Sequence, residues 1–245
     1  MEDKAIAILD VLGFENFVQN SKIENVLYSY ESLLACTHKA KEIIDNSNLK
    51  IFIYSDTIVI IDENLIEKSL YNLTYICSLL IGSFFQSLIS AFPLLPPIRG
   101  SICIGEYIFK KELKWQVSPI NEPIKVDNSN IFLGKAIIDG YKWERHQKWI
   151  GISYSKESKI KLENDYINVL NNLTEKNLLI KYSVPLEKEI VETYAVNCFL
   201  DIVPEKIIRK LQSIENNFTQ DINKKYQNTR KFFEYLLENS LFIKN

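Results

Sequence analysis

The segment 51–61 constrains the fold most strongly, because two short apolar runs flank a single small polar step. The runs 51–54 and 57–61 are rich in β-branched and aromatic residues, which favour strands. The residues between them, Ser55 and Asp56, are typical of a hairpin turn. We therefore predict a β-hairpin that holds the Asp56 carboxylate at its tip.

A second carboxylate has the same setting at the end of the first predicted strand. Residues 5–9 are apolar and Asp10 follows them directly. The predicted order is strand, helix, two strands, helix, strand. In a βαββαβ sandwich the right-handed crossover makes the first two strands parallel and places the third antiparallel between them. We therefore expect Asp10 and Asp56 to lie close together at one edge of the sheet.

The remaining elements follow from hydrophobic periodicity and turn signals. We predict helices at about 23–44, 66–92, 134–147 and 156–172, strands at 98–106, 149–153, 178–184 and 190–200, and an irregular excursion at 107–129. Residues 205–243 favour two helices with a break near Asn216-Asn217. The fold class is α+β, a ferredoxin-like βαββαβ sandwich over residues 1–203 with a helical C-terminal extension at 204–245.

The stretch 69–98 contains no charged residue and is long enough to span a bilayer. Polar side chains recur through it and Pro93, Pro96 and Pro97 break its end. We favour a helix buried on most of its circumference, partly by a partner subunit, over a membrane span.

Composition excludes several classes of function. A hydrophobic content of 47% and a formal net charge of −2 are ordinary for a globular protein and give no sign of a nucleic-acid partner. The two histidines, His38 and His146, disfavour a histidine-based site. The cysteines are far apart in apolar segments, which predicts reduced, buried thiols in a cytoplasmic protein: Cys36, Cys77, Cys103 and Cys198.

Two adjacent carboxylates repel each other unless a cation lies between them. Asp10, Asp56 and the Val11 carbonyl offer the oxygen ligands that suit two Mg²⁺ or Mn²⁺ ions. The turn Leu12-Gly13-Phe14 begins a predicted helix, where backbone N–H groups can bind a triphosphate. An aspartate at a strand end is also a common cap or turn residue, so the two acids alone leave a structural role open.

The surrounding motifs resemble those of class III nucleotide cyclases. Asp10-Val11-Leu12-Gly13-Phe14 resembles their first metal motif, and Tyr54-Ser55-Asp56 the second, with Ser where Gly is usual. The segments 98–106, 132–144 and 192–195 resemble their glycine-bearing strand, the helix with the transition-state residues and the closing strand. The details at Arg99-Gly100, Gly134/Ala136 and Val184-Pro185 are most similar to the cyclases of bacterial Pycsar antiphage systems, which make cyclic CMP or cyclic UMP.

The departures from this family bear on the substrate. Purine cyclases read their base with a polar pair, and the matching positions here hold Phe52 and Ile131. An apolar pair cannot hydrogen-bond a purine edge, which favours a pyrimidine. The alternative is that both residues belong to the hydrophobic core.

The resemblance also implies which cations act on the phosphates. The helix Asn of the family is Ile138 here and its Arg is Lys142, with Arg145 as the alternative cation. Lys188 is nearest to the lysine that contacts phosphate before the closing strand. The family's sites form between two subunits, which implies a homodimer whose second protomer supplies Lys142.

Together these observations predict a pyrimidine nucleotide cyclase that converts UTP, or else CTP, to the 3′,5′-cyclic nucleotide and pyrophosphate. The product would act in antiphage defence on a separate TIR-domain or membrane effector. Three alternatives stay open at this point: a purine cyclase, a cyclase-like domain that binds nucleotide or a partner without chemistry, and a membrane-associated adaptor.

Overall fold

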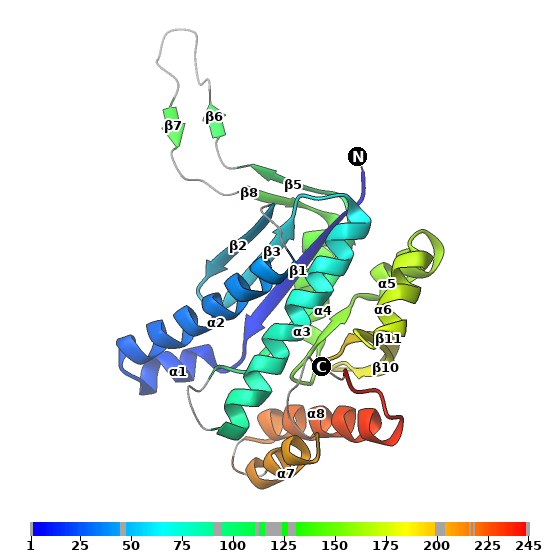
Figure 1. Cartoon of the computed structure of the whole chain (residues 1–245). Coiled ribbons are helices and arrows are strands. Elements are labelled where there is room, and N and C mark those ends of the chain that lie inside the picture. Colours follow the sequence, from blue (N-terminus) through cyan, green and yellow to red (C-terminus); the bar gives the residue numbers. More distant parts are fainter. Residues whose placement is uncertain are drawn as a thin grey trace.

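The computed structural model describes residues 2–44, 48–90, 95–110, 113–115, 124–126, 131–198, 204–215, 217 and 219–243. Its centre is a seven-stranded sheet in the order β10-β11-β9-β4-β1-β3-β2 (Figure 1). The bounds of these strands, in chain order, are β1 Lys4–Val11, β2 Leu49–Tyr54, β3 Thr57–Asp62, β4 Ile98–Gly105, β9 Ile152–Tyr154, β10 Leu179–Pro185 and β11 Ile190–Val196.

The central four strands have the predicted ferredoxin-like arrangement. Strand β3 pairs antiparallel with both β1 and β2, and β4 pairs antiparallel with β1. Strands β1 and β2 therefore run in the same direction on either side of β3. Strand β9 extends the sheet by pairing parallel to β4. The α+β fold class predicted from the sequence is confirmed.

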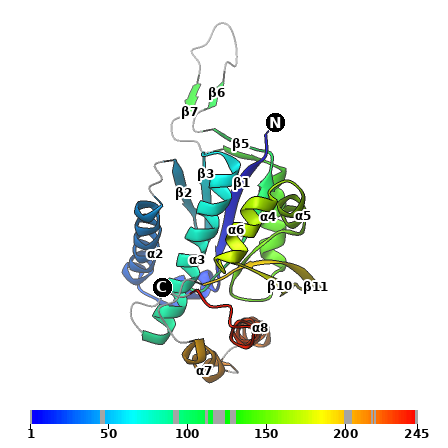
Figure 2. The ribbon, with the colours of Figure 1, turned by 45° about the vertical axis from the view of Figure 1, so that its right-hand side comes forward.

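Helices cover both faces of the sheet (Figures 1 and 2). Their bounds are α1 Phe14–Asn20, α2 Ile23–Ile43, α3 Ile66–Ser90, α4 Lys135–His146, α5 Lys156–Asn164, α6 Ile167–Glu175, α7 Pro204–Ile214 and α8 Gln220–Glu238. Because side chains alternate along a strand, Ala7 and Leu9 of β1 join the larger core under α2 and α3. Ile6 and Ile8 join a smaller core under α4.

Helix α3, which contains most of the charge-free stretch, lies in the larger core. Among the helices within the described ranges, it is the one long and apolar enough, by length and composition, to cross a membrane. Its side chains Leu73, Cys77 and Leu80 are buried against the sheet, α2 and α7. The chain's own elements thus bury much of this helix, and the prediction that a partner subunit covers part of it stays a prediction. This burial inside the fold does not favour the membrane-associated adaptor.

Two other predictions need correction. The excursion at 107–129 contains strands: β5 Tyr107–Lys110 pairs with β8 Ile131–Gly134, and β6 Leu113–Trp115 with β7 Ile124–Val126. The turn signals predicted at 118–119, 122–123 and 127–129 lie outside the described residues. The helix predicted at 156–172 is divided into α5 and α6, because Tyr166 between them departs from helical dihedral angles, with φ −127° and ψ 35°.

The C-terminal helices pack on the sheet at the end where β1 finishes and α1 begins (Figures 1 and 2). Asn228 Nδ2 donates to the Lys148 carbonyl at 2.7 Å, and the Ile150 N–H donates to Thr229 Oγ1 at 2.8 Å. The ring of Phe232 meets Trp149 edge-on at 5.0 Å between centroids. Helix α8 is thus held in a fixed position relative to the strands, and the break predicted near Asn216-Asn217 falls between α7 and α8.

Candidate functional site

The end of β1 and the β2–β3 turn meet at one cavity of about 430 Å³. The Val11 N–H donates to the Asp56 carbonyl at 2.9 Å, and Asp10 lies in register with Thr57. We call this cavity the acid cavity. It is lined by Asp10, Val11, Leu12, Gly13, Phe14, Glu15, Asp56, Thr57, Arg99, Tyr141, Glu144, Arg145 and Lys225.

The turn that carries Asp56 is fixed by its backbone and by a tyrosine. Ser55 has a φ of 56°, in the left-handed region that non-glycine residues rarely adopt. The Tyr30 hydroxyl of α2 donates to the Ser55 carbonyl at 2.9 Å. Burial raises the pKa of Tyr30 to about 12, and the charges of Asp56 and Asp10 contribute to the rise. The hydroxyl therefore stays protonated and keeps the turn in place.

A buried guanidinium connects the acid pair to α4. Arg99 lies opposite Asp10 in the β1–β4 register, and its Nη2 is 3.2 Å from Asp10 Oδ2. Its Nε donates to Glu144 of α4, and its Nη1 donates to the Gln147 carbonyl at 3.2 Å. Only 13% of the Arg99 side chain is exposed. Arg99 thus restricts the orientation of the Asp10 carboxylate.

Two carboxyl groups of the acid cavity, Asp10 and Glu144, have raised pKa values. Burial raises the pKa of Asp10, Arg99 opposes this, and the charge of Asp56 raises it further. Burial likewise raises the pKa of Glu144 to about 7, because it outweighs the stabilising charge of Arg99 and because Asp10 is near. Such repulsion is relieved when a cation binds.

These residues fit a divalent cation. Asp10 and Asp56 supply hard oxygen ligands at one cavity, which is the donor type that Mg²⁺ and Mn²⁺ prefer. Within the described ranges, no three His, Cys, Asp or Glu side chains form a metal-binding group. An ion would therefore depend on the two aspartates together with backbone, solvent and substrate oxygens.

The raised pKa of Glu144 predicts a dependence of stability on pH. Between its ordinary value of 4.5 and about 7, the folded chain holds more protons than the unfolded chain. The free energy of unfolding should therefore fall as the pH rises through this window, by up to about 3 kcal/mol from this group. Denaturant unfolding with EDTA measures this fall, and the slope should be shallower in Glu144→Gln. Equal slopes in the two proteins would contradict the assignment.

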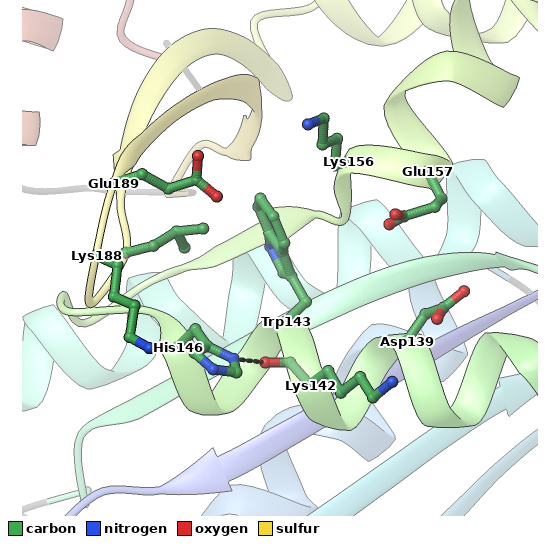
Figure 3. Close-up of a pocket in the computed structure, with 9 residues that line it drawn as sticks. Asp139, Lys142, Trp143, His146, Lys156, Glu157, Lys188 and Glu189 are labelled. Carbon is green, nitrogen blue, oxygen red and sulfur yellow. Dashed lines mark hydrogen bonds between the residues drawn. The ribbon is translucent and has the colours of Figure 1, made fainter.

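Two of the predicted cations line a second cavity, also of about 430 Å³. Figure 3 shows Lys142 on α4 and Lys188 near the turn between β10 and β11, with His146 between them and Trp143 also lining the cavity. The His146 ring is bonded to the Lys142 carbonyl at 2.5 Å. Within one chain, the structure therefore groups Arg145 with the acid pair and places Lys142 and Lys188 elsewhere.

The positions predicted to read the base lie in an aromatic group outside the acid cavity. The ring of Phe52 lies 5.0 Å from those of Phe109 and Phe132, measured between centroids. Ile131 precedes Phe132 on β8 and is half-buried. Phe52 thus packs beside the smaller core with Phe109 and Phe132, whereas Ile131 is the strand neighbour of Phe132 and, by alternation along β8, points to the other face.

Sequence reasoning gave no role to four charged residues of the acid cavity: Glu15, Arg99, Glu144 and Lys225. Arg99 could have been found, because it is the charged residue in the otherwise apolar strand 98–105. That strand runs antiparallel to the strand that ends in Asp10. For Lys225 there was no signal, because the sequence does not specify where α8 packs.

Comparison with known proteins adds information at the level of the fold. No family model and no curated protein matches the chain. Solved structures do match. The catalytic core of a rhodopsin-guanylyl cyclase with converted specificity, in complex with ATPαS, superposes with a TM-score of 0.52 at 13% identity, covering 80% of this chain and 96% of that one.

Two fungal domains give a similar result. The guanylate cyclase domain of RhGC from Catenaria anguillulae, in complex with GTP, has a TM-score of 0.51 at 13% identity, covering 80% of this chain and 97% of that one. A non-canonical dimeric guanylyl cyclase domain of the RhoGC fusion protein from the aquatic fungus Blastocladiella emersonii also has a TM-score of 0.51 at 13% identity, covering 80% of this chain and 96% of that one. This chain therefore has the fold of class III nucleotide cyclase catalytic domains.

Proposed function

We propose that the chain is a metal-dependent nucleotide cyclase that acts on a pyrimidine nucleoside triphosphate as a homodimer. The observation that carries this proposal is the acid cavity, where Asp10 and Asp56 meet beside the Gly13 turn on a nucleotide cyclase fold. Gly13 has a φ of 72°, and the space where its Cβ would lie is open. A phosphate group can therefore approach the backbone closely at this turn.

In the proposed reaction the ribose 3′-oxygen attacks the α-phosphorus and pyrophosphate leaves. One P–O bond forms and one breaks, and the hydroxyl proton passes to solvent. When bound, the divalent ions lower the pKa of the hydroxyl and neutralise charge on the leaving group. Asp10 and Asp56 would hold these ions, and Arg99 restricts the orientation of the Asp10 carboxylate.

The separation of the cations supports a site shared between two chains. Arg145 lines the acid cavity, whereas Lys142 and Lys188 line the second cavity. A twofold dimer that sets the second cavity of one chain against the acid cavity of its partner would bring all of these groups together. Lys142 would then neutralise charge that develops on the transferred phosphate.

The apolar side chains at Phe52 and Ile131 support a pyrimidine substrate. Neither side chain can hydrogen-bond the edge of a purine, and the neighbouring rings of Phe109 and Phe132 offer a stacking surface. We favour UTP over CTP. The sequence resemblance to Pycsar cyclases extends the proposal to a cytoplasmic role in antiphage defence, with the product read by a separate TIR-domain or membrane effector.

The test is turnover of each of the four nucleoside triphosphates by the purified chain with Mn²⁺, followed by pyrophosphate release and by chromatography of the nucleotide product. We expect cyclic UMP or cyclic CMP. Cyclic AMP or cyclic GMP alone would indicate a purine cyclase instead.

A second candidate function is nucleotide binding without chemistry. The observations that favour it are Ile138 and Lys142, which replace the Asn and Arg of the family helix, since Lys lacks the bidentate fork of Arg. Tight binding of a triphosphate with no pyrophosphate release from any of the four would support it over the cyclase.

A further inference from the structure

We infer that Lys225 of α8 binds the terminal phosphates of the substrate in its own chain's acid cavity, so that the C-terminal extension forms part of the active site. The identity of the ligand as a nucleotide rests on the proposed function. The chemistry at Lys225, a cation for a metal-bound polyphosphate, can be tested separately.

Lys225 lies where two cavities meet. It lines the acid cavity and also a neighbouring cavity of about 630 Å³ between α1 and α8. The residues that both cavities share are Leu12, Gly13 and Lys225. Lys225 therefore stands where the acid cavity continues past the Gly13 turn. A polyphosphate whose α-phosphate lies at Asp10 and Asp56 has room to extend in this direction.

Contacts of α8 with the rest of the chain hold Lys225 in place. Thr229, one turn further along α8, donates its hydroxyl to the Lys225 carbonyl at 2.8 Å and accepts the Ile150 N–H. Lys148, at the end of α4, binds Asp221 at the start of α8 at 2.9 Å. Only 15% of the Lys225 side chain is exposed. A positive charge fixed in this way costs little conformational entropy when it binds a ligand.

Lys225 shares its carboxylate partner with a second lysine. Asp221 accepts both Lys148 at 2.9 Å and Lys225 at 3.2 Å, so one carboxylate serves two ammonium groups. Their hydrogen bonds and charges lower the pKa of Asp221, Lys148 making the larger contribution. Because Asp221 is 54% exposed, water can replace Lys225 as its partner. The Lys225 ammonium group is then available to a polyphosphate, which carries more negative charge than the Asp221 carboxylate.

Within the described residues, the acid cavity offers few cations to the terminal phosphates of the substrate. Arg99 is already occupied by Asp10 and Glu144. Lys142 and Lys188 line the second cavity. Of the cations that line the acid cavity in the described part of the chain, Arg145 and Lys225 are the ones that no carboxylate of that cavity engages. Lys225 is the one on the Gly13 side.

The experiment is calorimetric titration of the full chain with Mn²⁺ and inorganic pyrophosphate. We expect Lys225→Met to weaken pyrophosphate binding about tenfold and Lys225→Arg to retain most of it, as for a charge-assisted contact with phosphate. Lys224→Met is the matched control, because Lys224 is the exposed neighbour and does not line the acid cavity. It should bind as the unmodified chain does.

Asp221→Asn separates a ligand contact from a structural ion pair. It removes the Asp221–Lys225 pair but keeps the cation, so pyrophosphate should bind at least as tightly as before. The inference is overturned if Lys225→Met binds normally, if Lys224→Met loses as much, or if Asp221→Asn is as weak as Lys225→Met. Absence of pyrophosphate binding to the unmodified chain would overturn it as well.

These outcomes are independent of the cyclase proposal. A chain that binds pyrophosphate through Lys225 but turns over none of the four triphosphates keeps this inference and rejects the cyclase. The opposite outcome is a chain that makes a cyclic nucleotide while Lys225→Met keeps both its pyrophosphate affinity and its KM. That outcome keeps the cyclase and rejects this inference.

Discussion

Asp56→Asn is expected to reduce cyclic nucleotide formation by about 10³-fold or more, since it removes one of the two carboxylates that would hold the divalent ions. The same change should not destabilise the fold. The charge of Asp56 raises the pKa of Asp10, so its loss relieves repulsion in the metal-free protein. The Asp56 carbonyl still accepts the Val11 N–H, because that contact uses only the backbone. Initial rates with Mn²⁺ and thermal unfolding with EDTA measure the two effects.

Glu15→Gln provides the control for this experiment. Glu15 lines the same cavity from α1, but it does not lie at the junction of β1 and the hairpin turn. Its loss should change the rate less than about tenfold. If Glu15→Gln were as inactive as Asp56→Asn, or if Asp56→Asn kept its activity, the acid pair would not be the metal site.

Mixing two inactive variants should restore activity if the site is shared between chains. Asp56→Asn lacks a functional acid pair, and Lys142→Ala lacks the cation proposed to act on the partner. A heterodimer of the two contains one intact site, made from the acids of the Lys142→Ala chain and the Lys142 of the other chain. Random reassociation should therefore recover about a quarter of the unmodified activity, because half of the dimers are mixed and each has one working site.

Arg145→Ala supplies the matched comparison. Arg145 lines the acid cavity of its own chain, so the chain with intact acids would carry the Arg145 defect in every mixed dimer. The pair Asp56→Asn and Arg145→Ala should recover no activity above that of Arg145→Ala. Recovery with Arg145→Ala and none with Lys142→Ala would exchange the roles of the two cations.

The sequence predicted the parts of the fold that depend on local pattern and chain topology. The hairpin at 51–61 and the order of the first four strands followed from alternation, turn residues and the handedness of crossovers. That topology also predicted that Asp10 and Asp56 would share an edge. Helix α3 was predicted at its observed start, Ile66, from its continuous apolar run.

Other features depend on contacts that no local pattern encodes. The contacts of α3 with α2 and α7 join distant segments of the chain, and the strands within 107–126 depend on pairing across a long connection. The Arg99–Glu144 pair joins residues 45 positions apart, and Lys225 reaches the acid cavity only because α8 docks on Lys148 and Ile150. Tertiary packing therefore added the charges that surround the predicted acids.

The central claim is that Asp10 and Asp56 hold divalent ions together. Crystals grown with Mn²⁺ and a non-cyclisable triphosphate, measured at the manganese absorption edge, test it most directly. The account predicts anomalous peaks within about 2.3 Å of both carboxylates and in contact with phosphate oxygens. A bound triphosphate whose manganese ions lie away from either aspartate would contradict it.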